Sequence, residues 1–402
     1  MFAFSTSAGR FAAALLGLGL LGAAATRASA QTQVSGNRGG TAGCGRADPA
    51  YIRTANETGG IPMFLQRSEA GKAFQLVRES TRQNVATVLW ATGTLKGAET
   101  INIPVDSVTQ RITFAFSVDT KGTELRLEQP SGAVIVPGSG GAEVTELNCG
   151  RIVTVSSPRA GNWRAHVSGS GHFWLEAQAQ SDIYFIGSEF VHLGGRPGHE
   201  GLFRIAGQPV AGKPATLKVS LSAQGTRSAH FFLVGEDGER IQTLRLRRAN
   251  SDREFLEFAG EVDLPAKPFR VAVYGNDVHG NPYQRFFAGL YHAETVEVSA
   301  VREFDDVTPA SVAEAKFTVR NIGAPRTFKI TVTDTRGFVS NVEPRELPLG
   351  ADESGTVRVQ LKIPAVPPTD AEDDVVIVAA STTGPPTSNS SVAHLSVAFP
   401  SR

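Results

Sequence analysis

The two cysteines of this 402-residue chain, Cys44 and Cys149, carry its most clearly defined chemistry. In an oxidising compartment, two thiols on one chain are candidates for a disulfide. Such a bridge would tie the N-terminal region to the loop that precedes a predicted strand at residues 152–155. Two free thiols are the alternative. Lipidation of Cys44 is a third interpretation, which the absence of the usual leucine of a lipoprotein signal disfavours.

Residue patterns typical of catalytic and metal sites are missing or incomplete. The sequence contains no Gly-x-Ser-x-Gly nucleophile elbow and no His-Glu-x-x-His zinc motif. His192 and His199 flank a glycine-rich turn, but zinc usually takes three or four ligands, so we expect an ordinary loop. Acidic stretches at residues 305–306 and 372–374 could offer oxygen atoms to calcium, although solvated loops have the same composition. We therefore predict no enzyme, with no catalytic, cofactor-binding or metal-binding residues.

An exposed aromatic side chain is the more promising source of function, and Trp174 is the candidate. It belongs to residues 158–177, where apolar and polar residues alternate on both sides of Gly169-Ser170-Gly171. This pattern predicts a β-hairpin with one buried face. The residues on that face would be Trp163, Val167, Phe173 and Leu175. Trp174 would point to the opposite face, where a second sheet or a helix covers it or a partner contacts it.

Short strands separated by Gly, Pro, Asn and Asp turns must position these side chains. The 42 glycines and 22 prolines indicate many turns, as in all-β proteins. We predict three tandem Ig-like or jelly-roll-like β-sandwiches, at residues 98–190, 191–300 and 301–402. Residues 31–50 are interpreted as a flexible linker, and residues 51–97 as a helix followed by a strand. The predicted fold class is therefore all-β with one short N-terminal helix.

The one predicted helix covers residues 68–80, with Ser68 and Glu69 as start signals. Its apolar residues recur at helical spacing and would form one face: Ala70, Ala73, Phe74 and Val77. This helix is one of the elements that could cover Trp174.

The first 30 residues resemble a secretory signal peptide. Arg10 precedes an apolar run at residues 11–25, and Ala28-Ser29-Ala30 fits the small-x-small cleavage pattern. We predict a mature chain that begins at Gln31 and does not span a membrane, because the apolar run is short for a span. An uncleaved anchor is the alternative. The expected location is secreted, extracellular or periplasmic, in association with the cell surface.

The charge balance argues against one class of partner. Lys and Arg total 39, and Asp and Glu total 39, so the chain has no basic footprint for nucleic acid. A local basic run is interpreted as a solvated strand edge that resists pairing with other strands: Arg240, Arg245, Arg247 and Arg248. The partner we expect is a protein or a glycan at the cell surface.

Several stretches, taken in order, resemble the region that follows the von Willebrand factor A domain in hemicentin-like and other von Willebrand factor A domain-containing proteins, including bacterial relatives. They lie at residues 58–60 and 68–80, 103–107, 125–132, 158–171, 269–275, 280–285, 317–321 and 334–338. The last two stretches resemble bacterial Ig-like repeats. The resemblance covers residues 57–400, and the order of the motifs carries more weight than any one of them.

The chain departs from these families at their metal-dependent adhesion site, which requires Asp-x-Ser-x-Ser after a buried strand. The nearest match, Asp352-Glu-Ser354-Gly-Thr356, follows a turn and is expected to be a loop. We therefore do not carry metal-dependent binding over. The resemblance implies a non-enzymatic adhesion or interaction scaffold. The alternatives are a carbohydrate-binding accessory module, which needs a row of exposed aromatic rings, and an undetected hydrolase, which needs polar side chains converging in a cleft.

Overall fold

The computed structural model describes residues 32–34, 44, 48–195, 198, 200–249, 254–367 and 372–397. The predicted signal peptide at residues 1–30 lies outside these residues, as do Gln31 and most of the predicted linker. In the part of the chain that is described, no helix is both long enough and apolar enough to cross a membrane.

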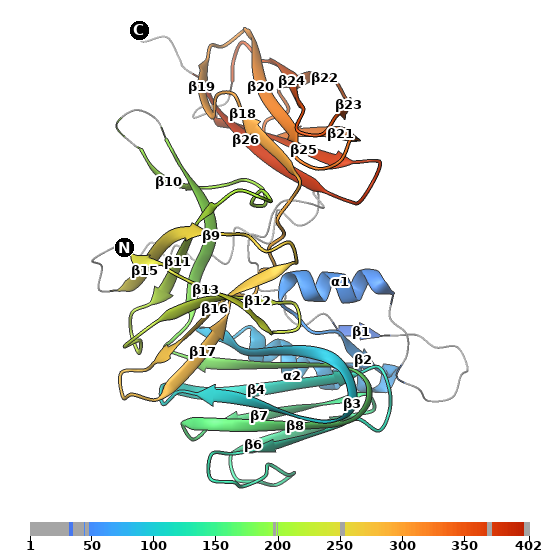
Figure 1. Ribbon diagram of the computed structural model, residues 1–402, viewed down its shortest axis with the longest axis vertical. Coiled ribbons are helices and arrows are strands. Elements are labelled where there is room, and N and C mark those ends of the chain that lie inside the picture. Colours follow the sequence, from blue (N-terminus) through green and yellow to red (C-terminus); the bar gives the residue numbers. More distant parts are fainter. Residues whose placement is uncertain are drawn as a thin grey trace.

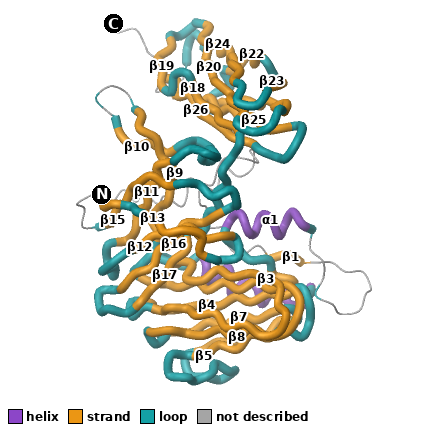
Figure 2. The backbone as a smooth tube through the Cα atoms, in the orientation of Figure 1, coloured by secondary structure: helices purple, strands orange, loops and turns teal. Residues whose placement is uncertain are grey.

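Strands dominate the molecule, and the helices are short and belong to the N-terminal part (Figure 2). Helix α1 spans Pro49–Thr58 and helix α2 spans Ala70–Ser80, preceded by a 3-10 turn at Arg67–Glu69. The predicted all-β, Ig-like fold class is confirmed, with one helix more than expected. A small parallel pair, β1 (Thr32–Val34) and β2 (Met63–Leu65), accompanies the helices.

Local signals, rather than an apolar stripe, delimit α1. Asp48 accepts a hydrogen bond from the Ala50 N–H at 2.9 Å, and Pro49 occupies the first turn. Gly59 ends the helix in the left-handed conformation. Ala55 is the one buried residue of this helix, so hydrophobic periodicity gives no sign of it.

The first sandwich comprises β3 to β8 and is organised by two long strands. Strands β3 (Val85–Val105) and β8 (Gly161–Ser181) pair antiparallel along almost their whole lengths. Both strands bend in the middle, as Figure 1 shows, and Gly97 lies opposite Gly169 at this corner. The two ends of β8 then take different neighbours, β4 at one end and β5 at the other. The remaining strands are β4 (Thr109–Val118), β5 (Glu124–Glu128), β6 (Ala142–Leu147) and β7 (Gly150–Ser156).

The hairpin predicted at residues 158–177 is wrong, because residues 161–177 belong to the single strand β8. Gly169 and Gly171 have φ angles of 131° and 97°, which bend the strand from one layer of the sandwich to the other without reversing it. A Cβ atom at Gly171 would lie 2.5 Å from the Thr120 hydroxyl, so the neighbouring loop also requires glycine there. Alternation continues through the corner, so the predicted buried face is still one face.

The apolar face predicted for α2 is also wrong. Phe74 is 72% exposed, whereas Leu76 and Glu79 are buried. Glu79 forms an ion pair with Arg111 of β4 at 2.8 Å, and Gln75 accepts a hydrogen bond from Thr145 of β6 at 2.6 Å. Helix α2 docks on the sheet partly through these polar contacts. The spacing of its apolar residues therefore predicted the wrong face as the docked one.

The second sandwich comprises β9 to β17 in two sheets. One sheet has the order β10-β9-β11-β15-β14, and the other has the order β13-β12-β16-β17. The second of these continues into the first sandwich through the pair Phe286 and Thr87, so a single ten-stranded sheet crosses the junction. The strands are β9 (Phe185–Gly194), β10 (Gly201–Arg204), β11 (Ala215–Ser222), β12 (His230–Gly235), β13 (Arg240–Leu244), β14 (Arg247–Arg248), β15 (Phe255–Val262), β16 (Phe269–Asn276) and β17 (Pro282–Phe286).

The third sandwich comprises β18 to β26 and stands at the far end of the molecule in Figure 1. Its sheets have the orders β18-β20-β24-β22 and β19-β26-β25-β21-β23. The strands are β18 (Val296–Ala300), β19 (Phe304–Val307), β20 (Val312–Asn321), β21 (Arg326–Asp334), β22 (Val339–Glu343), β23 (Glu346–Leu349), β24 (Ser354–Lys362), β25 (Glu372–Ser381) and β26 (Ser388–Val397). Each sandwich has its own hydrophobic cluster. The domain boundaries given above stay predictions. The ten-stranded sheet crosses the predicted boundary near residue 190.

Candidate functional site

The first core buries the four side chains that the sequence places on one face of β8: Trp163, Val167, Phe173 and Leu175. The Trp163 ring lies 5.9 Å from the Phe114 ring, and its Nε1–H donates to the Arg159 carbonyl at 2.9 Å. These residues support the sandwich and are out of a partner's reach.

Trp174 occupies the opposite face of β8, yet it is only 5% exposed. Its ring centroid lies 5.5 Å from that of Phe64 in β2 and 4.4 Å from that of His172. The N-terminal strand β2 therefore contributes to its cover. The ring offers a partner almost no surface.

Cys44 and Cys149 are joined by a disulfide, with their Cα atoms 5.5 Å apart. Cys149 lies in the turn between β6 and β7, so the bridge fastens the N-terminal segment to the first sandwich. The two residues are 105 positions apart, and a loop of that length strongly restricts the unfolded chain. The disulfide is therefore part of the framework.

A serine, an aspartate and a histidine meet where the first and second sandwiches join. Ser107 Oγ lies 2.7 Å from Asp277 Oδ2 and 3.0 Å from His279 Nδ1. In a catalytic triad the carboxylate orients the histidine ring, whereas Asp277 here accepts from Ser107 and from the backbone N–H groups of Ser107, His279 and Asn281. Burial raises the pKa of Asp277, but these hydrogen bonds outweigh it and hold the pKa below its ordinary value. The cluster therefore closes a loop around an anionic carboxylate.

Histidines and carboxylates elsewhere form pairs. Among the described residues, no group of three or more His, Cys, Asp or Glu side chains is placed to hold a metal ion. His192 lies 3.2 Å from Glu303, and His394 lies 2.7 Å from Asp374. His199, the other residue of the histidine pair considered above, lies outside the described residues. The stretch from Asp352 to Thr356 was expected to be a loop. Asp352 lies in the turn before β24, but Ser354 and Thr356 belong to β24, so that expectation is wrong for them.

The junction between the first and second sandwiches buries charged side chains. Arg285 of β17 forms an ion pair with Asp106 at 2.5 Å, and neither side chain is exposed to solvent. Arg285 also donates to the Ile183 carbonyl at 2.7 Å and to Ser181 Oγ at 2.8 Å. Asp106 accepts a further hydrogen bond from Thr109 at 2.9 Å. Every partner needed to hold this pair comes from the two sandwiches that it connects.

A second buried group at this junction titrates near neutral pH. Burial raises the pKa of Glu176 to about 7, against the hydrogen bonds from Gln178 and Thr87 and the charge of Arg270, which lower it. Arg270 lies over the Trp90 ring with 4.8 Å to its centroid, and burial lowers its pKa to about 10. Arg270 therefore stays charged over the range in which Glu176 loses its proton.

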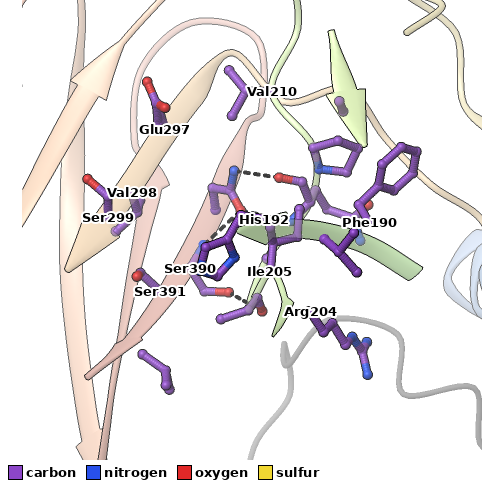
Figure 3. Close-up of a pocket in the computed structure, with 18 of the residues that line it drawn as sticks. Phe190, His192, Arg204, Ile205, Val210, Glu297, Val298, Ser299, Ser390 and Ser391 are labelled. Atoms are coloured by element: carbon purple, nitrogen blue, oxygen red, sulfur yellow. Dashed lines mark hydrogen bonds between the residues drawn. The ribbon is translucent and has the colours of Figure 1, made fainter. Parts of the chain in front are cut away.

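The second and third sandwiches are separated by a cleft of about 550 Å³ (Figure 3). This volume lies in the range of small-molecule pockets. The half-buried side chains of Ile205 and Val210 contribute to its wall on the second sandwich, and Val298 of β18 to its wall on the third. Ser390 of β26 lies between them. The cleft is thus built from segments far apart in the sequence.

Asn389 holds the two walls of this cleft together. Its Nδ2 donates to the Gln208 carbonyl and to the Val296 carbonyl, each at 3.0 Å, and its Oδ1 accepts from the Gln208 N–H at 2.9 Å. A Cβ atom at Gly207 would lie 1.9 Å from this Oδ1, so glycine is required beside it. His192 in this region was a candidate from the sequence, whereas Asn389 was not. The polar run Ser388–Ser391 at the start of β26 was the available signal.

One ion pair and one histidine–carboxylate contact lie in the lining of the cleft. Lys213 Nζ lies 2.7 Å from Glu297, and His192 Nε2 lies 3.2 Å from Glu303. Their side chains are partly exposed, so solvent screens the charges. The walls therefore combine apolar side chains with the paired charges of Lys213 and Glu297, an arrangement suited to binding.

The comparisons with known proteins agree with the architecture at the C-terminal end. Residues 296–399 match the family model of the VWA7 Ig-like domain. Hemicentin-1 of Mus musculus is 22% identical over 239 residues, which are 58% of this chain and 4% of that protein. This chain therefore spans only a small part of the length of that relative.

Similarity to solved structures is broad and low. A three-Ig fragment of titin covers 78% of this chain and 99% of its own length, with 11% identity and a TM-score of 0.17. A Bacillus licheniformis lipase in its propeptide form covers 50% of this chain and 40% of its own, with 13% identity and a TM-score of 0.25. Scores this low carry no argument about function. The resemblance stated from the sequence is confirmed by the family match and by hemicentin-1: the chain carries an Ig-like region of the kind associated with von Willebrand factor A domains.

Proposed function

We propose that this chain is a non-enzymatic scaffold that is exported and binds a protein or glycan at the cell surface, in adhesion or surface assembly. The observation that supports it best is the pair of side-chain junctions that connect three β-sandwiches in series. Sandwiches held in a fixed order present a long surface, which suits binding more than enclosure of a substrate. The disulfide between Cys44 and Cys149 fits export to an oxidising compartment.

A carbohydrate-binding accessory module is less well supported. Such a module needs several aromatic rings in a row on one face. Among the described residues, the exposed large aromatic side chains are Tyr51, Phe74 and Tyr274, and they lie on α1, α2 and β16. These are three separate elements, so no observation favours a flat sugar-binding platform.

Binding to intact cells tests the proposed function. The mature chain, labelled with a fluorophore, is added to cells of the producing organism, and bound fluorescence is measured by flow cytometry. We expect saturable binding that persists in EDTA, because no metal site is invoked. Binding no greater than that of the heat-unfolded chain would contradict the proposal.

A hydrolase assay tests the non-enzymatic part separately. We expect no turnover of a panel of ester and glycan substrates. Ser107→Ala is the informative variant, because Ser107 is the serine that contacts both a histidine and an aspartate. Turnover by the wild-type chain that this variant abolishes would show that the cluster is catalytic.

A further inference from the structure

An ion pair that crosses the second junction lies in the lining of the cleft. Lys213, in the loop before β11, contacts Glu297 of β18 through its Nζ at 2.7 Å. The backbone beside this pair is anchored across the same junction. The Ala211 N–H donates to the Glu294 carbonyl at 2.9 Å, and the Glu294 N–H donates to the Pro209 carbonyl at 2.9 Å. These bonds help to hold the ammonium and the carboxylate side by side in the wall of the cleft.

The ion pair keeps hydrogen-bonding capacity for a ligand. A lysine ammonium has three N–H donors, and Lys213 uses one of them on Glu297 Oε2. The other carboxylate oxygen, Glu297 Oε1, has no hydrogen-bond partner among the described residues. Ser299 lies two residues further along β18, so its exposed side chain is on the same face of the strand as Glu297. Donors and acceptors therefore lie next to each other in this wall.

The formal charges in the lining of the cleft cancel when its histidines are counted as neutral. Among the described residues that line it, the cations are Arg204 and Lys213, and the carboxylates are Glu297 and Glu303. A charged ligand would compete with an existing partner for one of these groups, and a group that loses its partner inside a cleft is costly. A neutral polar ligand has no such cost. The charge balance therefore favours a neutral ligand.

Small apolar side chains lie in the same lining. Val210 and Pro214 belong to the loop that carries Lys213, and Val298 lies on β18 beside Glu297; Figure 3 labels both valines. Val210 and Val298 are half-buried, and Pro214 is exposed. Aliphatic groups of this size can pack against the C–H groups of a single sugar ring. The volume of about 550 Å³ is that of a small-molecule pocket, so it suits the end of a glycan.

We propose that the cleft binds a neutral sugar residue at the end of a surface glycan, and that Lys213 and Glu297 hold two adjacent hydroxyl groups of this residue. One hydroxyl oxygen accepts from the ammonium, and the other hydroxyl donates to the carboxylate. Because a hydroxyl both donates and accepts, a neutral polyol satisfies the two groups without separating them. This inference rests on the proposed function and names a glycan, rather than a protein, as the partner. It needs no aromatic platform, because a single terminal residue enters the cleft.

Binding of fluorescently labelled oligosaccharides to the full mature chain tests the ligand class. The neutral probes end in glucose, galactose, mannose or N-acetylglucosamine, and the acidic probes end in glucuronic acid or sialic acid. Dissociation constants are measured by fluorescence polarisation. We expect saturable binding of a neutral probe and weaker binding of both acidic probes. Failure of every neutral probe to bind, or tighter binding of an acidic probe, would overturn the proposal.

Matched variants test whether the bound probe occupies the cleft. Glu297→Gln removes the carboxylate charge and keeps the shape, and Lys213→Met removes the ammonium. Each should weaken binding about tenfold, the effect of losing one hydrogen bond to a charged group. The controls are Glu314→Gln and Lys316→Met, in a partly exposed ion pair of 3.0 Å on β20 that does not line the cleft, and they should leave binding unchanged. Wild-type affinity in both cleft variants would show that the sugar binds elsewhere.

Deoxy analogues test the contact with two adjacent hydroxyl groups. The methyl glycoside of the bound sugar should displace the labelled probe. An analogue that lacks either hydroxyl of the pair should compete about tenfold less well. If every deoxy analogue competes as well as the parent glycoside, the assigned contact with Lys213 and Glu297 is wrong.

A parallel measurement keeps this proposal distinct from the scaffold function. Binding to intact cells is measured for Glu297→Gln and for its control, Glu314→Gln. Loss of cell binding in Glu297→Gln alone, with a folded chain by circular dichroism, supports both proposals. Full cell binding by Glu297→Gln leaves the scaffold function standing and overturns the cleft as its partner site. Glycan binding without cell binding by the wild-type chain overturns the scaffold function alone.

Discussion

The two junctions of the molecule are built in opposite ways. Between the first and second sandwiches, a sheet runs continuously and the ion pair of Asp106 and Arg285 is completely buried. Between the second and third, the ion pair of Lys213 and Glu297 keeps 44% and 34% of its side-chain surface in solvent. There a cleft of about 550 Å³ remains open.

This difference implies that the two junctions differ in rigidity. A buried charge must have its partner at one position, because leaving it unpaired costs several kcal/mol. An exposed pair contributes little and tolerates rearrangement. We infer that the first junction fixes the geometry of the scaffold, whereas the second can adjust. The four predictions below test this contrast.

Removing one member of the buried ion pair should have the largest effect. Asp106→Ala leaves the Arg285 guanidinium buried without its carboxylate, and such a change costs about 3–5 kcal/mol of the free energy of unfolding. Urea denaturation followed by tryptophan fluorescence measures it. The double variant Asp106→Leu with Arg285→Met should recover much of the loss, since no charge is then buried. A single-variant cost below about 1 kcal/mol would contradict the assigned role.

The buried carboxyl of Glu176 should make this junction sensitive to pH. The Glu176 pKa is about 7 in the folded chain, compared with an ordinary value of 4.5. Between these values the folded state keeps a proton that the unfolded state has lost. The free energy of unfolding should therefore fall as the pH rises from 4.5 to 7, by about 3 kcal/mol, and level off above.

The control for this prediction is Glu176→Gln, which keeps the shape and removes the titration. Denaturation midpoints measured from pH 4.5 to 8 should show a smaller decline in the variant than in the wild-type chain. Equal slopes in both proteins would show that Glu176 is not the group responsible.

Asn389, at the second junction, should contribute less to the free energy of unfolding than the buried groups of the first junction. Asn389→Ala removes four side-chain hydrogen bonds, two of them with Gln208, and leaves the Val296 carbonyl without its donor, which costs about 1–3 kcal/mol. Denaturation gives the cost, and small-angle scattering should show a more variable placement of the third sandwich. Asn162→Ala, at an exposed asparagine of the first sandwich, is the matched control and should change stability by less than about 0.5 kcal/mol. Equal effects of the two variants would remove Asn389 from the junction.

The sequence predicted local features of the fold better than features that depend on contacts between distant residues. The alternation of Trp163, Val167, Phe173 and Leu175 predicted their shared buried face correctly, because side-chain direction depends only on strand periodicity. The same residues gave the wrong topology. Glycines with positive φ permit either a tight turn or a bend. Which one forms depends on Gly97, which pairs with Gly169 from a strand far away in the sequence.

The cleft between the second and third sandwiches was harder to predict, because its lining residues come from segments far apart in the sequence and no local pattern marks them. Val298 lies in β18, but its place in the cleft wall depends on how the second and third sandwiches meet. Asn389 and Gln208 are 181 residues apart, and nothing in either local pattern indicates their contact. Phe74 shows the opposite error: its helical spacing predicted burial, but the side chain is exposed. Spacing alone does not show whether another element packs on a residue.

The exposed ion pair that lines the cleft should have the smallest effect and gives the sharpest test of the contrast. Lys213→Ala should cost about 0–1 kcal/mol, and a double-mutant cycle with Glu297→Ala should give a coupling energy in the same range. Raising the salt concentration to 1 M should abolish that coupling, because the Debye length then falls to about 3 Å. The coupling of Asp106 with Arg285 should survive the same salt, since no solvent reaches either side chain. A Lys213–Glu297 coupling that is large and insensitive to salt would mean that the second junction is as fixed as the first.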